Sequence, residues 1–255
     1  MNTAVGSFGY AQARVQARLG QRVSADDLQR ARAARELSAY LQHVRSTALV
    51  RRVARVAPGM DIHEVERRLR DEWRATVEEV ASWLPSPWRP ATLWLRWLPY
   101  LPALQKLARG GRAAAWTRED AVLARIIAAE PGRRAGVLGG TALEPLQAAV
   151  AAHGDVGQAW LAHWRALWPD DVQAKRGLER LARDVIDATS AMADLGPAAH
   201  SEEALARLDR RLLRALRRHP LSPVAAFAFL GLEALDQLEL RGAVVARVAL
   251  AEKPS

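Results

Sequence analysis

The sequence contains no cysteine, and this absence excludes disulfide bonds and metal sites built from thiolates. It has no continuous apolar run of about 18 residues, so no segment reaches the length of a membrane-spanning helix. Alternating β-branched residues are nearly absent too, which removes the fold classes built on sheets. The N-terminal segment lacks a basic stretch followed by an apolar one, so we expect no secretory signal and a cytosolic type of protein.

Lysine is also scarce: only Lys106, Lys175 and Lys253 occur, and every other basic residue is arginine. The net charge is nevertheless +9, in a chain rich in alanine and leucine. Such a bias is as typical of the base composition of the coding DNA as of selection for charge. A basic protein favours acidic partners such as nucleic acid, anionic headgroups or acidic protein surfaces. No zinc-finger, RNP or basic-zipper pattern accompanies the charge, so we expect no specific nucleic-acid partner.

Catalytic and cofactor motifs are missing as well. The six histidines are scattered, without HExxH or the Glu-x-x-His pair of di-iron bundles. Neither of the phosphate-binding glycine motifs GxxxxGK[ST] and GxGxxG occurs. The aspartate pairs at residues 26–27 and 170–171 lack the third aspartate of a magnesium–diphosphate site. We therefore expect a non-enzyme with no cofactor and no metal. The other interpretation is a stand-alone all-α enzyme with an unrecognised pocket, which would purify with a bound small molecule or metal.

Apolar residues at steps of three and four predict helices along almost the whole chain. Two of these helices begin with capping boxes, Ser24-x-x-Asp27 and Thr117-x-x-Asp120. Pro- and Gly-rich breaks separate helical hairpins of about thirty to fifty residues, without a repeat of fixed period. The expected fold class is all-α. The clearest predicted helices are 23–44, 61–84, 117–130 and 201–219, and the breaks are 57–61, 84–90, 108–112, 130–140 and 195–200.

Tryptophan is concentrated in two places. One is a Pro-rich segment and the other a stretch with three tryptophans four residues apart, on one face of a helix. Indoles in such a segment indicate either a surface resting at a membrane interface or a core between short irregular helices. We favour the core. The residues are Trp83, Trp88, Trp94 and Trp97 in the first segment, and Trp160, Trp164 and Trp168 in the second.

The stretch "FGYAQARVQARL" at residues 8–19 predicts a helix with an unusual polar face. Tyr10, Arg14 and Arg18 lie one turn apart on this face, with Ala13 and Ala17 between them. We interpret it as a contact face whose arginines pair with carboxylates in the fold or at an interface. The small alanines would admit a facing helix, so that the guanidinium groups are partly desolvated. The alternative is that Arg14 and Arg18 are simply solvated.

The C-terminal segment predicts one long helix that begins at Ser222 and Pro223. Its apolar surface is wide enough to indicate burial on more than one side. Arg241 falls within the apolar stripe, and a buried guanidinium needs a carboxylate partner. Glu233, Asp236 and Glu239 are near in sequence, but Asp236 points away from Arg241. We therefore expect that partner on another helix. The stripe is formed by Phe227, Leu230, Ala234, Leu238, Arg241, Val245 and Val248.

Both ends of the chain resemble the C subunit of the A/V-type rotary ATPases, whose counterpart in eukaryotic vacuolar enzymes is the d subunit. That family opens with a Tyr-Ala-x-Ala-Arg-Val-x-Ala helix, matched here at residues 10–17. The segments 23–53 and 61–73 are similar to the stretches that follow. The family's closing helix carries Glu-x-x-Asn-Leu-Arg; Leu240 and Arg241 match it, while Asp236 replaces Glu and Glu239 replaces Asn. The likeness covers about 80 N-terminal and about 35 C-terminal residues.

This resemblance implies three similar helical domains arranged as a pseudo-threefold funnel, with a shortened or divergent middle part. The corresponding segments are 1–110, with the motif helix, 111–200, and 201–255, a C-terminal hairpin that completes the fold. Members of the family are non-catalytic. They cap the proteolipid ring of the membrane sector and couple it to the central shaft during ion transport.

The resemblance also implies the partners and the location of the chain. The partners would be the proteolipid ring, the central shaft subunits and anionic lipid headgroups, and the place would be the cytoplasmic face of the membrane. Arg14 or Arg241 would belong to a polar network shared by the first and last helices. The alternative function is a basic helical module that binds nucleic acid.

Overall fold

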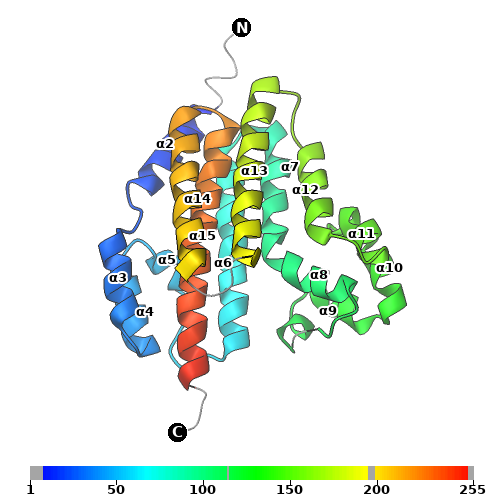
Figure 1. The fold of residues 1–255 in the computed structure, drawn as a ribbon, viewed down its shortest axis with the longest axis horizontal. Coiled ribbons are helices and arrows are strands. Elements are labelled where there is room, and N and C mark those ends of the chain that lie inside the picture. The colour runs from blue at the N-terminus through cyan, green and yellow to red at the C-terminus, as the bar shows by residue number, and fades with distance from the viewer. Residues whose placement is uncertain (1–7, 114, 195–198, 252–255) are drawn as a thin grey trace. The chain divides into compact units, whose positions relative to one another are not determined.

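A computed structural model describes residues 8–113, 115–194 and 199–251 of the chain (Figure 1). These residues contain helices and connecting turns but no strand, so the predicted all-α fold class is confirmed. The chain divides into two compact units. The first lies within Met1–Thr92 and Pro169–Ser255, and the second is Leu93–Trp168.

The boundaries of the two units differ from the three segments 1–110, 111–200 and 201–255 expected from the sequence. The reason is the last helix, α15 (Pro223–Ala251), which packs against helices of the N-terminal third. It contacts α2 (Gly9–Leu19), α4 (Leu37–Arg45) and α6 (Ile62–Trp83). The two ends of the chain therefore form one compact body.

Four long helices build most of the first unit, and α15 is the central one. It contacts α13 and α14 as well as α2, α4 and α6, and Figure 1 shows the long helices side by side. Shorter elements of the N-terminal third complete the unit. The remaining elements are α3 (Ala25–Ala33), α5 (Val50–Val53), η1 (Ser86–Trp88), α13 (Val172–Asp194) and α14 (Ala199–Arg218), while α7 (Arg89–Trp94) continues into the second unit.

The predicted burial of α15 on more than one side is confirmed for its first two turns, where residues 224–230 are all buried. Beyond them the buried stripe differs from the expected one. Leu240, Val244 and Val248 face the core, whereas Leu238 is 43% exposed. The stripe is therefore displaced by about one residue, because the second half of the helix packs on one side only.

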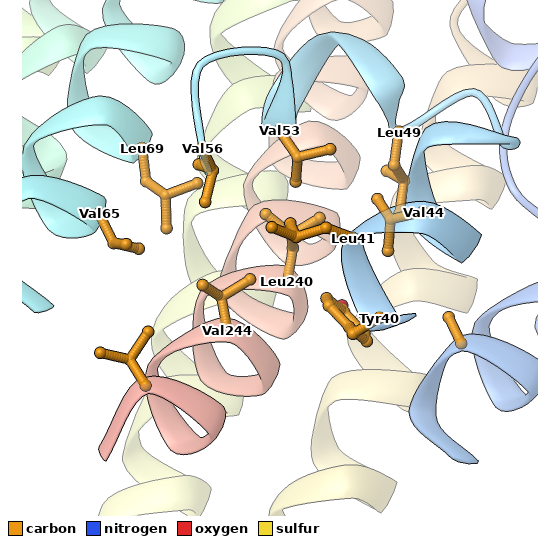
Figure 2. Close-up of a cluster of buried hydrophobic side chains, with 12 residues drawn as sticks. Tyr40, Leu41, Val44, Leu49, Val53, Val56, Val65, Leu69, Leu240 and Val244 are labelled. Carbon is orange, nitrogen blue, oxygen red and sulfur yellow. The ribbon is translucent and has the colours of Figure 1, made fainter. Parts of the chain in front are cut away.

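Side chains from α4, α6 and α15 share a hydrophobic core with the segment that connects α4 to α6 (Figure 2). Each buried leucine or valine of such a core contributes about 1.5–3 kcal/mol relative to an exposed one. The core thus joins residues that lie about 200 positions apart in the sequence. Its labelled members are Tyr40, Leu41, Val44, Leu49, Val53, Val56, Val65, Leu69, Leu240 and Val244.

The second unit consists of short helices held together by aromatic side chains. The Trp94 indole donates a hydrogen bond to the Trp160 carbonyl at 3.1 Å, and the two rings stack at 6.3 Å. Trp164 lies against Trp160 and Trp168. The elements are η2 (Leu95–Tyr100), α8 (Leu101–Ala108), η3 (Ala115–Arg118), α9 (Leu123–Ala128), η4 (Pro131–Arg133), α10 (Arg134–Leu138), η5 (Glu144–Leu146), α11 (Gln147–Ala151) and α12 (Val156–Ala166).

The tryptophans of both segments are buried, so the favoured core interpretation is confirmed. Each is at most 8% exposed, which leaves too little indole surface for these residues to form a membrane-interface belt. Separately, none of the described helices is long and apolar enough to cross a membrane.

Two predicted helices begin or continue differently in the structure. The helix expected over 23–44 is broken between α3 and α4, where Arg247 donates hydrogen bonds to the Ala34 and Arg32 carbonyls and so satisfies the end of α3. The helix expected from Thr117 starts later, at Leu123, and Thr117 lies in η3. The Asp120 carboxylate accepts hydrogen bonds from the backbone N–H groups of residues 122 and 123 at the start of α9. Ser24 caps α3 as predicted. Within the predicted break at 195–200, residues 195–198 lie outside the described residues.

Candidate interaction site around the first and last helices

The apolar face of α2 fixes the position of its polar face. The sequence places Phe8, Ala11, Val15 and Leu19 on the apolar face; the first three are buried and Leu19 is half-buried, and they pack α2 against the rest of the first unit. The helix contacts both α6 and α15. The opposite side, with Tyr10 and Arg14, is consequently turned outward.

Arg14 and Arg18 share one carboxylate, that of Glu79 on α6. Arg14 Nη2 lies 3.4 Å from Glu79 Oε1, and Arg18 forms a closer ion pair with Oε2 of the same side chain. Both guanidinium groups also lie over the Trp83 ring, at 5.2 and 5.8 Å from its centroid. Cation–π contact adds to the charge pairing at such distances. The structure thus brings two of the predicted residues together on one acid.

The pKa of Glu79 is lowered by this arrangement. Partial burial opposes ionisation and is the largest influence, but the hydrogen bond from Arg18 and the charges of Arg18, Arg51 and Arg14 outweigh it together. Glu79 therefore stays ionised well into the acidic range. The pairing is stronger for Arg18 than for Arg14, whose side chain remains 45% exposed.

Tyr10 does not join this cluster, and the alanines admit no facing helix from the described chain, so their expected role at an interface stays a prediction. The Tyr10 side chain is 62% exposed, and Ala13 and Ala17 are exposed beside it. No described helix packs over the alanines, because α2 uses its opposite face for burial. The surface formed by Tyr10, Ala13, Arg14 and Ala17 is therefore free, and we call it the α2 outer face.

Asp236 on α15 forms the centre of a second cluster. Arg22, which follows α2, approaches it with Nη2 at 2.6 Å from Oδ1 and also pairs with Asp209 of α14 at 2.5 Å. Arg52 of α5 lies 3.3 Å from Asp236 and 2.7 Å from Glu233. Four elements of the first unit thus meet at two guanidinium groups. Their side chains are between 10 and 27% exposed, so these pairs are far less screened by water than surface pairs.

This cluster contains three carboxylates and only two guanidinium groups. The excess of negative charge contributes to a raised pKa of Glu233. Burial is the main cause that raises the pKa of Glu233; the Arg52 charge opposes this rise and the Asp236 charge adds to it. Arg22, unlike Glu233, is stabilised in its charged form. Its burial disfavours the charged form, but hydrogen bonds to Asp236 and Asp209 raise the Arg22 pKa overall.

Further along α15, Glu239 and Arg247 reach the N-terminal helices as well. Glu239 Oε1 pairs with Arg32 Nη2 of α3 at 2.9 Å. The Arg247 guanidinium lies 4.2 Å from the Tyr40 ring centroid and also binds backbone carbonyls at the end of α3. Glu239 and Arg247 therefore both attach α15 to α3, and Arg247 also contacts α4 through Tyr40.

Arg241 finds its partner on another helix, as predicted, and the partner is Glu66 of α6. Arg241 Nε lies 2.7 and 2.9 Å from the two Glu66 oxygens, and Nη2 lies 2.6 Å from Oε1. The expectation that Arg241 is buried is wrong, because its side chain is 51% exposed. The buried members are Glu66 and Arg70, at 9 and 5% exposure, whose side chains form a further pair at 3.7 Å.

Arg14 and Arg241 do not share one network. Both bind α6, but through Glu79 and Glu66, which lie 13 positions apart and hence roughly 20 Å apart along the helix. Three separate clusters, which we call the charged clamps, therefore attach α2 and α15 to the rest of the unit. Their carboxylates are Glu79, Asp236 with its neighbours, and Glu66.

The chemistry of the charged clamps is that of fixed ion pairs. Each carboxylate accepts hydrogen bonds from guanidinium groups, an arrangement that holds helices in register. Among the residues described by the structure, no group of three or more His, Cys, Asp or Glu side chains is arranged so that it could hold a metal ion.

No protein-family model matches the chain, and no curated protein matches it. The resemblance to the rotary ATPase family therefore rests on the residues of the two terminal motifs.

The sequence did not point to most partners in the charged clamps. Arg22, Arg52 and Glu79 occur among many charged residues on amphipathic segments, with nothing local to single them out. Glu66 and Arg70 carry a weak signal: each directly follows a core residue of α6, Val65 and Leu69, at the edge of the apolar stripe. An apolar stripe on α6 drawn one residue wider would have included Glu66 and Arg70.

Proposed function

We propose that the chain is a non-catalytic adaptor subunit of an A/V-type rotary ATPase, which couples the proteolipid ring to the central shaft. The observation that supports this proposal is the contact between the two helices that bear the terminal motifs. The motif residues 10–17 and 240–241 are more than 220 positions apart in the sequence, yet their helices, α2 and α15, contact each other and α6 within one unit.

A coupling subunit must transmit torque without yielding, and the charged clamps suit this task. They attach α15 directly to α5 and α6, and to α14 through Arg22, in addition to the hydrophobic core. The Arg32–Glu239 pair adds α3. Ion pairs with fixed geometry resist sliding of one helix along another better than a purely apolar contact, because a slip would separate charges in a partly desolvated site.

The α2 outer face supports the proposal from another side. An adaptor needs a surface for its partners, and Tyr10 is an exposed large hydrophobic side chain of the motif helix. Tyrosine and arginine are the residue types most often responsible for binding energy at protein interfaces. Tyr10 and Arg14 on this face are therefore the proposed contacts to the ring or the shaft. The pseudo-threefold funnel and the cytoplasmic face of the membrane belong to the same proposal.

Affinity purification from the organism that makes the chain, in mild detergent, tests this function. The tagged full-length chain should recover proteolipid and shaft subunits, identified by mass spectrometry, together with ATP hydrolysis. A Tyr10→Ala variant should lower recovery at least tenfold without changing the melting temperature. Gln16→Ala, an exposed substitution elsewhere on α2, serves as the matched control and should recover the complex normally.

Two other results would contradict the adaptor. Recovery of the 28.0 kDa chain alone would leave no partner to couple. Recovery of nucleic acid that is lost as the salt concentration rises would favour the basic nucleic-acid-binding module instead.

A further inference from the structure

A cavity of about 630 Å³ lies in the first unit, where α13 passes the C-terminal half of α14. Figure 1 shows these two helices side by side, and they are in contact. The volume falls within the range of sites that bind small molecules. Basic side chains make up most of its lining: Arg180, Arg211, Arg214, Arg217, Arg218 and His219.

The charge balance of this cavity is strongly positive. Asp184 is the only acid among the described lining residues, and Arg211 neutralises it with an ion pair of 3.0 Å. The end of α14 contributes about half a negative charge through the helix dipole. Four guanidinium groups remain, each permanently protonated, so the net charge is roughly +3.5.

Three of these guanidinium groups have no partner of their own. Within the described residues, Arg180, Arg217 and Arg218 form no hydrogen bond or ion pair. The arginines of the charged clamps, by contrast, are each bound to a carboxylate. The excess of positive charge also affects His219. Burial lowers the pKa of His219, and the charges of Arg218 and Arg180 lower it further. The cavity thus presents several cations that nothing in the described fold neutralises.

The backbone around the cavity is fixed. The turn after α14 is held by Ser222 Oγ, which donates to the His219 carbonyl at 2.7 Å, and by Gln12 Oε1, which accepts from Leu221 N at 3.1 Å. On α13, a Cβ at Gly177 would lie 2.6 Å from Val224 Cγ2, so only glycine permits this approach of α13 to α15. A preformed site loses less conformational entropy on binding.

We propose that this cavity binds the phosphate groups of a small phosphorylated anion. Guanidinium groups match phosphate oxygens in pairs of parallel hydrogen bonds. Four exposed arginines that are not paired with an acid of the described chain line this open cavity. The volume exceeds that of one phosphate, which favours a ligand with two or more phosphate groups or a phosphate on a larger headgroup. A soluble polyphosphate compound and an anionic lipid headgroup share this chemistry. Phosphate binding here does not depend on the adaptor function.

Isothermal titration of the purified full-length protein with tripolyphosphate, in detergent-free buffer, is the first arm of the test. We expect saturable binding at one site. The double variant Arg180→Gln/Arg218→Gln should weaken it at least tenfold. The matched control, Arg183→Gln/Arg210→Gln, removes the same charge from exposed positions of the same two helices outside the cavity, and should change the affinity less than twofold.

The second arm distinguishes the source of the phosphate. Vesicles of phosphatidylcholine with and without phosphatidylglycerol are sedimented with the same three proteins. Binding to the anionic vesicles that is lost in the cavity variant and kept in the control assigns the headgroup of a lipid. Binding of tripolyphosphate alone assigns a soluble compound.

Two results would overturn the site. One is the absence of saturable binding in both arms. The other is equal weakening by the cavity variant and the control, which would show a diffuse effect of positive charge, as in non-specific contact with nucleic acid. Circular dichroism melting of each variant verifies that the fold is retained.

Discussion

The two units of this protein are held together by different means. In the first, ion pairs and core contacts join segments far apart in the sequence, such as Arg22 and Asp236, which are separated by 214 positions. In the second, helices of at most 11 residues surround a tryptophan core, and the longest described hydrogen bond in sequence, from Trp94 to Trp160, spans 66 positions. The first unit therefore depends on charge and on both ends of the chain, whereas the second is assembled locally.

The largest expected effect breaks the second unit. Trp164→Ala removes the central ring of the tryptophan cluster, which is 5% exposed and contacts Trp160 and Trp168. We expect a loss of about 4 kcal/mol in the free energy of unfolding, because a large cavity is left. Urea denaturation followed by circular dichroism measures it. Gln158→Ala, at an exposed position of the same helix, should change stability by less than about 0.5 kcal/mol, and an equal loss there would contradict the account.

Asp236→Ala breaks the first unit and should be the next largest effect. It leaves Arg22 and Arg52 without their shared acid in a site where all three side chains are mostly buried. We expect about 3 kcal/mol of destabilisation, measured by the same denaturation. Asp170→Ala removes an exposed acid of the same unit that binds only Lys175, and its melting temperature should equal that of the wild type.

The salt dependence of Glu79→Gln separates the charge pairing of the first unit from the aromatic packing of the second. Its side chain is 32% exposed, so its pairs with Arg14 and Arg18 are partly screened. We expect a loss of about 1 kcal/mol at roughly 0.1 M salt and less than half of that at about 1 M. The loss caused by Trp164→Ala should be the same at both concentrations. A salt-independent effect of Glu79→Gln would mean that the charge pairing contributes nothing.

The pH dependence of the free energy of unfolding should be the smallest effect. It is also the most specific one, because Glu233 and Glu79 should change stability with pH in opposite directions. The raised pKa of Glu233 means that the folded state holds its proton more firmly than the unfolded state. The wild type should therefore lose stability relative to Glu233→Gln as the pH rises above about 4.5.

Glu79 has a lowered pKa, so its contribution is present above about pH 4.5 and is lost as the pH falls through the folded value. Denaturation of both Gln variants between about pH 3 and pH 7 measures the two slopes. Slopes of the same sign would contradict the opposite environments of the two acids.

The same contrast explains how far the sequence predicts the structure. The long helices α6, α14 and α15 were predictable because each carries an apolar stripe over many turns, and single residues that break the pattern do not hide its periodicity. Helices of three to six residues in the second unit, such as α9 and α10, carry fewer than two turns of pattern. So short a pattern does not fix where each helix begins and ends.

The candidate site divides in a similar way. Arg14, Arg18, Asp236, Glu239 and Arg241 could be selected because their helix faces mix charge with small or apolar residues. Their partners could not, since a guanidinium group accepts any carboxylate that the fold delivers. Arg241 shows the limit of the helical wheel: a shift of the stripe by one residue moved it from the expected core to the surface.

Hydrogen exchange of the intact chain tests most directly whether its two ends form one charge-clamped body. Peptides of α2, α6, α12 and α15 would be compared between the wild type and Asp236→Ala by mass spectrometry. We predict that α2, α6 and α15 lose protection together in the variant while α12 keeps its own. Loss of protection in α15 alone, or an equal loss in α12, would contradict the account.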